Sequence, residues 1–197
     1  MAEVKTTEEY DGSSWTSGGT ASDTGGEFAA LAGLQTDALA VGGYTGAYHA
    51  NAESYNGTIW ATEADPSVNQ HAGSAVASGH EDYIFAGGSG DGHDPNGTYH
   101  YDGTEWSSGG NLSNDRHVAC MNGTTGDAIY SQGSGSRASD SELYDGSTWS
   151  SGPTASAGRY SPSNSVACSG SANGVVFAGG TSSANSAGTN GIQHYDE

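Results

Sequence analysis

The chain is short, acidic and poor in hydrophobic residues. Its 197 residues include four Lys or Arg against 23 Asp or Glu, for a formal net charge of −19, and 33% of them are hydrophobic. This charge repels phosphate, so we expect no nucleic-acid partner, and no run approaches the ~20 apolar residues of a membrane-spanning helix. Such a composition is typical of disordered chains, but eleven Tyr and four Trp recur in a repeated pattern. The repetition predicts one ordered domain over residues 1–197.

The first element in chain order is a Tyr-Trp segment that occurs four times. Its copies are EYDGSSW (9–15), SYNGTIW (54–60), HYDGTEW (100–106) and LYDGSTW (143–149). The aromatic pairs are Tyr10–Trp15, Tyr55–Trp60, Tyr101–Trp106 and Tyr144–Trp149. The Asp-Gly or Asn-Gly after each tyrosine favours a type I′ turn, which predicts a hairpin with Tyr on one strand and Trp on the next. A truncated copy, QHYDE (193–197), has Tyr195 and no tryptophan.

Between these segments lies a short strand that ends at glycine. Its copies are DALAVGG (37–43), DYIFAGG (82–88), DAIYSQG (127–133) and GVVFAGG (174–180), each preceded by an Ala-rich run. The closing glycines are Gly42 and Gly43, Gly87 and Gly88, Gly133, and Gly179 and Gly180. The third copy has lost one glycine, which predicts a local distortion there. The unit therefore has strand a (Ala-rich), strand b (ending at glycine), strand c (Tyr) and strand d (Trp).

The order Gly-Gly, Tyr and Trp over about 45–50 residues resembles the kelch repeat. The Gly-His and Trp-Asp dipeptides that are typical of WD40 repeats are missing. The resemblance covers nearly the whole chain and implies an all-β fold, a four-bladed β-propeller with four antiparallel strands per blade. The blades would span approximately residues 26–62, 69–108, 114–151 and 160–196, with 1–8 as an arm.

The amino-acid sequences of the repeats are also similar to those of low-complexity kelch-like proteins of marine bacteriophages, especially cyanophages. Runs such as EEYDGSSWTSGG (8–19) and ALAVGGY (38–44) carry this likeness. It implies a structural virion protein, such as a tail-fibre head, capsid decoration or knob, located at the particle surface and made in the host cytoplasm. Residues 1–10 lack the apolar core of a signal peptide. The implied partners are other virion proteins, a host receptor or glycan, or further copies of the chain.

The fourth blade has no tryptophan strand of its own. Residues 13–19 form an unpaired d strand, so we expect them to pair with the blade formed by 160–196 and to close the ring, because propellers protect their strand edges by radial repetition. Residues 6–10 and 191–196 are then two c strands for one position. One of them would be displaced, form an extra strand or pair with another subunit.

The loops between strands b and c differ most from copy to copy in length, charge and aromatic content. Variable loops on a fixed scaffold are where recognition usually lies. The candidate binding residues in these loops are Tyr44, Tyr48, His49, Asp91, His93, Asp94, Asn96 and Arg137. A lectin-like module for host glycans is the alternative function, and loops that bind nothing are the alternative to any binding role. A kelch-type enzyme is the third interpretation.

We expect neither catalysis nor a cofactor, since no nucleophile, His and carboxylate set stands out. His71 and His117 align at the start of strand a, where a hydrogen-bonded pair is favoured over a metal site, because such a site needs three or four ligands. The loop at 89–97 offers oxygen ligands for calcium, but its spacing is not that of a known calcium loop, so we expect no metal.

The two cysteines, Cys120 and Cys168, lie in the similar contexts HVAC and SVAC of successive repeats. Corresponding strands of neighbouring blades are usually too far apart for disulfide geometry. We therefore expect both thiols to be free and buried, with a bridge between them as the alternative.

Overall fold

The structure is a computed structural model that describes residues 5–22, 29–69, 71–89, 92, 94–133, 139–156, 158, 166–171, 173–179 and 192–196. These residues form β-strands, turns and loops, with no helix among them, so the predicted all-β fold is confirmed. The described part of the chain accordingly has no helix that could cross a membrane.

The strands form five antiparallel sheets. In chain order, the strands are β1 (Thr6–Tyr10), β2 (Trp15–Thr20), β3 (Ala30–Leu34), β4 (Asp37–Val41), β5 (Ala52–Tyr55), β6 (Trp60–Thr62), β7 (Ser74–Gly79), β8 (Asp82–Ala86), β9 (Thr98–Tyr101), β10 (Trp106–Ser108), β11 (Cys120–Thr124), β12 (Asp127–Ser131), β13 (Ser141–Tyr144), β14 (Trp149–Ser151), β15 (Val166–Ser171), β16 (Gly174–Gly179) and β17 (Ile192–Asp196). We call β1–β2 the N-terminal hairpin, and β3–β6, β7–β10, β11–β14 and β15–β17 the first to fourth sheets.

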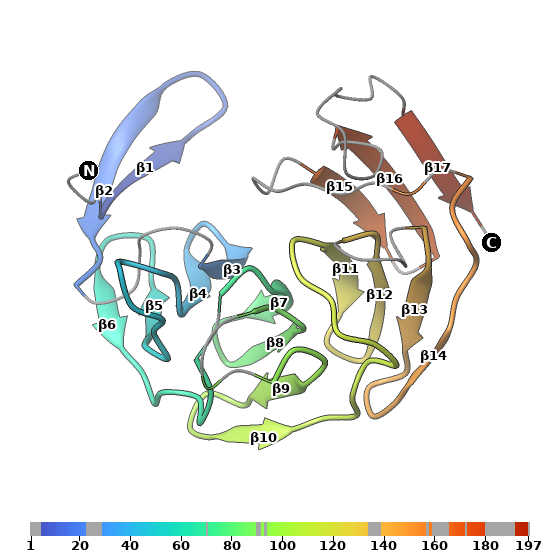
Figure 1. Ribbon diagram of the computed structural model, residues 1–197. Coiled ribbons are helices and arrows are strands. Elements are labelled where there is room, and N and C mark those ends of the chain that lie inside the picture. The colour runs from blue at the N-terminus through green and yellow to red at the C-terminus, as the bar shows by residue number, and fades with distance from the viewer. Residues whose placement is uncertain are drawn as a thin grey trace.

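Each of the first three sheets has the expected order a, b, c, d, with consecutive strands paired. Figure 1 shows the sheets arranged in an arc, with β3, β7, β11 and β15 on the inner side and β6, β10 and β14 on the outer side. Successive inner strands contact one another, β3 with β7, β7 with β11 and β11 with β15. Small residues suit these strands because several of them converge there.

The two ends of the arc do not meet in Figure 1. Strand β2 pairs with β1, and the fourth sheet has the order β15-β16-β17, so the expected pairing of residues 13–19 with that sheet is not among the described strand pairs. A four-residue turn connects β1 to β2, and so short a loop costs little entropy to close. Residues 6–10, expected to be one of two c strands, form β1 and pair with β2.

The predicted type I′ turns are wrong. Tyr and Trp are register partners in each c–d hairpin, which leaves a four-residue turn between them. Only the glycine of that turn has a positive φ, at Gly12, Gly57, Gly103 and Gly146. The preceding Asp or Asn instead accepts hydrogen bonds from two backbone N–H groups of its own turn, an Asx arrangement.

Among the residues whose side chains are described, two hydrophobic cores fill spaces between successive sheets. Between the first and second sheets, Leu39 and Val41 of β4 pack with Tyr83, Phe85 and Tyr101. Strand b is buried on both faces, because alternate residues point to opposite sides of the sheet. In β8, Tyr83 and Phe85 therefore contact the first sheet's core, and the intervening Ile84 belongs to the core shared with the third sheet.

The expected distortion at the missing glycine is not found. Gln132 has φ 68°, close to the 66° of Gly87 at the same position of the preceding repeat. The pairing of β11 with β12 continues without a register shift. Gln132 is fully buried, so the third repeat accommodates a side chain in a backbone conformation that usually favours glycine.

The prediction of free cysteines is also wrong for Cys120. Cys120 is disulfide-bonded, and the only other cysteine of the chain is Cys168 on β15. Strands β11 and β15 contact each other. The expectation assumed widely separated strands, whereas inner strands of neighbouring sheets lie close together near the centre of the arc.

Candidate functional site

Tyr44 and Tyr48, which were predicted as binding residues, form an aromatic cluster with His71. The ring centroids of Tyr44 and Tyr48 lie 5.0 Å apart, and the His71 ring lies 5.7 Å from the first and 5.3 Å from the second. All three side chains are half-buried. Tyr44 and Tyr48 come from the loop between β4 and β5, and His71 precedes β7 of the next sheet, so the cluster spans two sheets.

A small hairpin holds the two tyrosines side by side. Tyr44 and Tyr48 form an isolated antiparallel bridge, and Gly46 between them has φ 104°. The next residue, His49, donates its backbone N–H to the Gly43 carbonyl at 3.2 Å, and its Nε2 lies 2.5 Å from Thr45 Oγ1. The predicted binding residue His49 thus supports the hairpin that carries the two tyrosines.

From the sequence, His71 was expected to form a hydrogen-bonded structural pair with His117 at the start of strand a, with a metal site as the alternative, and it was not among the predicted binding residues. Its Nδ1 lies 3.2 Å from Ser89 Oγ, and its carbonyl accepts the Ser89 N–H at 2.8 Å. Ser89 opens the b–c loop of the second sheet, so this histidine links the b–c loops of two successive sheets. In an antiparallel sheet, b–c and d–a connections leave from the same end. That rule could have placed His71 beside Tyr44 and Tyr48.

The second b–c loop is fastened to the chain that leads to β11. Asn96 donates its Nδ2 to the Leu112 carbonyl at 3.1 Å, and its own carbonyl accepts the Leu112 N–H at 2.8 Å. Asp94 accepts a hydrogen bond from the Tyr99 hydroxyl at 3.4 Å. These two predicted residues therefore have structural partners. Asp91, His93 and Arg137, and also Gly180, lie outside the described residues. Within the described ranges, no three His, Cys, Asp or Glu side chains are grouped to hold a metal ion.

The Tyr-Trp pairs join each sheet to the one before it. Trp106 Nε1 donates to the Ala64 carbonyl at 2.6 Å, and the Tyr101 hydroxyl donates to Glu63 Oε2 at 2.9 Å. Burial and this carboxylate raise the pKa of Tyr101 to about 12. In the third sheet, Trp149 Nε1 donates to Thr98 Oγ1 at 2.8 Å, and the Tyr144 hydroxyl lies 2.6 Å from His100 Nε2.

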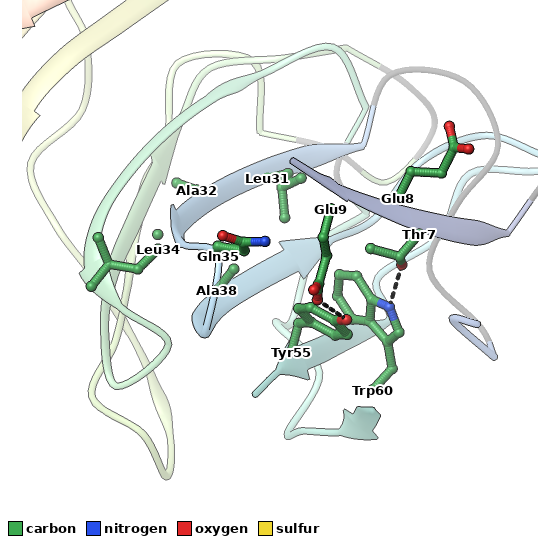
Figure 2. Close-up of a pocket in the computed structure, with 11 residues that line it drawn as sticks. Thr7, Glu8, Glu9, Leu31, Ala32, Leu34, Gln35, Ala38, Tyr55 and Trp60 are labelled. Atoms are coloured by element: carbon green, nitrogen blue, oxygen red, sulfur yellow. Dashed lines mark hydrogen bonds between the residues drawn. The ribbon is translucent and has the colours of Figure 1, made fainter. Parts of the chain in front are cut away.

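The N-terminal hairpin makes the contacts with the first sheet that a preceding sheet makes with the second and third sheets. Trp60 Nε1 donates to Thr7 Oγ1 at 2.8 Å, and the Tyr55 hydroxyl donates to Glu9, as the dashed lines in Figure 2 mark. The repeat residues thus act as inter-sheet contacts. Tyr10 and Trp15 differ, because no preceding sheet covers them in the described residues. Tyr10 is 50% exposed and Trp15 67%, whereas Tyr55 is 4% exposed.

A pocket of about 320 Å³ lies between the N-terminal hairpin and the first sheet. Figure 2 shows β1 on one side of it and β3, β4 and the Tyr55–Trp60 pair on the other. Its lining residues are Thr7, Glu8, Glu9, Leu31, Ala32, Gly33, Leu34, Gln35, Ala38, Tyr55 and Trp60. Two of its wall residues, Leu31 and Leu34, are 62% and 61% exposed. This pocket was not predicted from the sequence, because residues 13–19 were expected at the fourth blade and the place of residues 6–10 was left open.

Comparison with known proteins adds no assignment. No protein-family model matches the chain, and no curated protein matches its sequence.

Proposed function

We propose that the chain is a non-enzymatic binding and assembly protein of a bacteriophage virion, built as a closed four-bladed kelch-like propeller. The ring is supported by four successive sheets whose inner strands contact one another in order. The virion role is supported by the similarity of the repeat sequences to kelch-like phage proteins. The acidic composition suits a particle that must stay soluble in salt. Its partners are other virion proteins or a receptor on the host surface.

The Tyr44–Tyr48–His71 cluster carries the proposed binding role. Three half-buried rings within 6 Å of one another offer a rigid amphipathic surface, and Tyr is enriched at interfaces because it loses little conformational entropy on binding. The cluster lies at the end of the sheets where all b–c loops leave. The c–d turns, which hardly vary in sequence, leave from the opposite end.

The proposed function is tested by replacing both tyrosines of the cluster. We expect Tyr44→Ala with Tyr48→Ala to weaken attachment of the purified chain to host cells or to virus particles that lack it, by about tenfold or more. Ile59→Ala is the matched control, because Ile59 is an exposed apolar residue on a c–d turn. Equal attachment by both variants, each folded by circular dichroism, would place the interface elsewhere.

A glycan is the second candidate partner, and the same cluster favours it. Aromatic faces beside a hydroxyl and an imidazole, here Tyr44, Tyr48, Thr45 and His71, provide both stacking and hydrogen bonding for a sugar ring. A glycan array probed with the chain and with the double tyrosine variant would distinguish the two. Binding that the variant loses favours the lectin-like function, and an array without binding favours a protein partner.

A further inference from the structure

The pocket in Figure 2 occupies a position that strand b fills between other sheets. Between the first and second sheets, Leu39 and Val41 of β4 pack against the Tyr and Trp of the next sheet. Between the second and third sheets, Ile84 and Ala86 of β8 do the same. The N-terminal hairpin has strands c and d but no described strand a or b beside them. The space next to Tyr55 and Trp60 therefore lacks the two side chains that strand b supplies elsewhere, and the pocket is there.

The fourth sheet has the complementary composition. It has strands a, b and c as β15, β16 and β17, and the described part of the chain shows no strand d beside them. Counted back from the closing glycine, Val176 and Ala178 of β16 stand where Leu39 and Val41 stand in β4. The inner strand β15 contacts β11 on one side, and β3 contacts β7. A fourth inter-strand contact, β15 with β3, would continue this established series.

The N-terminal hairpin and the fourth sheet compete for one position. Strands β1 and β17 both carry the tyrosine of strand c, at Tyr10 and Tyr195. In the structure, β17 pairs with β16, and Val175 is the register partner of Tyr195. The corresponding pairs in the other sheets are Ala38–Tyr55, Tyr83–Tyr101 and Ala128–Tyr144. A ring of four blades has room for one such strand beside β16.

We infer that the pocket is the docking site of β16 of the same chain and that β1 takes the place of β17 beside it. The inference rests on the proposed closed ring, and it names the strand that closes it. Strand β1 is favoured because it brings strand d with it, as β2. The hairpin is also anchored to the first sheet, since Ser22 donates its N–H to Glu53 at 2.8 Å and Thr7 accepts from Trp60. The fourth sheet belongs to the same chain, so its effective concentration exceeds that of a second copy.

The test compares two double-cysteine variants that differ only in the competing tyrosine. One combines Val175→Cys with Tyr10→Cys, and the other combines Val175→Cys with Tyr195→Cys. After mild oxidation of the dilute chain, we expect the Tyr10 variant to form the engineered bond within the monomer. We expect no engineered bond to form in the Tyr195 variant. Peptide mass spectrometry separates the engineered bond from the native one at Cys120.

Each other outcome overturns the inference. A bond in the Tyr195 variant alone would show that β17 keeps its place, and a bond in neither variant would show that β1 does not reach β16. A bond of the Tyr10 variant only between chains would make a second copy the occupant. A truncation that removes residues 192–197 gives an independent measurement, because closure by β1 leaves the Tm unchanged or raises it. Cross-linking needs no binding partner, so its failure leaves the Tyr44–Tyr48 test intact.

Discussion

At the scale of single residues, the Asx turns give the hairpins a dependence on pH. Asp145 accepts the N–H groups of Ser147 and Thr148 at 2.9 and 2.7 Å. These bonds, with Thr148 as the larger cause, lower its pKa from 3.8 to about 2. Asp102 in the second sheet has a lowered pKa for the same reason. Asn56 makes the same two bonds with an amide that does not titrate.

Replacing Asp145 with Asn should therefore remove part of the acid sensitivity. A lowered folded-state pKa contributes stability that is present above about pH 4 and is lost as the pH falls toward 2. We expect Asp145→Asn to keep the turn and to flatten the decrease of Tm over that window. Asn56→Asp is the reciprocal variant and should steepen the decrease. Identical Tm profiles for both variants and the parent chain would contradict the assignment.

Gly87 is a position where two physical requirements meet. Its φ is +66°, and a Cβ there would lie 2.5 Å from the Tyr130 hydroxyl and 2.6 Å from the Arg116 carbonyl. Gly92 has a similar φ of +73°, but its nearest neighbour would lie at 3.4 Å. A side chain at either glycine would strain the backbone, but only at Gly87 would it also overlap neighbouring atoms.

We expect Gly87→Ala to destabilise the fold by about 2–4 kcal/mol, as the sum of a left-handed backbone and an overpacked interface. Gly92→Ala should cost only about 1 kcal/mol, the backbone part. Urea unfolding of both variants measures the difference. Equal losses would mean that the Tyr130 hydroxyl moves aside and that the closing glycine is needed for its φ alone.

At the scale of the strands, glycines after strand d allow one sheet to approach the next. Gly110 donates its N–H to the Ser147 carbonyl at 3.0 Å, and a Cβ on it would lie 2.6 Å from the same oxygen. At Gly19, near the end of β2, a Cβ would likewise lie 2.7 Å from the Thr58 carbonyl. The N-terminal hairpin therefore contacts the first sheet as the second sheet contacts the third.

Gly110→Ala should separate the second and third sheets. We expect a loss of about 1–3 kcal/mol in the free energy of unfolding, because the added methyl overlaps backbone that cannot rotate away. Gly126→Ala is the control, since a Cβ there has no neighbour within 4 Å. A Gly110 variant as stable as the Gly126 variant would show that the inter-sheet contact is looser than the structure indicates.

The sequence predicted the elements better than their contacts. Each Tyr-Trp segment predicted a hairpin correctly, because the hydrophobic pattern and the turn residues are local. The turn type was wrong, because the Asp side chain rather than a positive φ at Asp stabilises it. Tyr44 and Tyr48 were predicted as binding residues, but His71 was not assigned to them, because it comes from the next sheet. Contacts between sheets depend on stacking that no local pattern specifies.

At the scale of the whole molecule, Cys120 on an inner strand is disulfide-bonded. Cys120 is on β11 of the third sheet, and the chain's other cysteine is on β15 of the fourth. Reduction should lower stability by about 2–4 kcal/mol, because the cross-link restricts the unfolded chain. Thermal unfolding with and without a phosphine reductant tests this, with Cys120→Ser as the genetic equivalent. An unchanged Tm in both cases would contradict a stabilising role.

The net charge of −19 opposes the compact state through self-repulsion. Salt screens such repulsion over a Debye length of about 10 Å at 0.1 M and 3 Å at 1 M. We expect the Tm to rise as sodium chloride increases across this range, and attachment to an anionic surface to strengthen likewise. An uncharged osmolyte at matched osmolality is the control. A Tm that falls with salt would mean that attractive ion pairs outweigh the repulsion.

In the first three sheets, the Tyr-Trp pairs bond to segments that come earlier in the chain. The pair of the third sheet bonds to Thr98 and His100 on β9, and that of the first sheet bonds to Thr7 and Glu9 on β1. During synthesis, each sheet therefore emerges from the ribosome after the surface that receives its aromatic pair. The hairpin is made first, so Thr7 and Glu9 are already present when Trp60 and Tyr55 emerge. The first three sheets can in this way form one repeat at a time during translation, and only the proposed closure of β1 against β16 waits for the end of the chain.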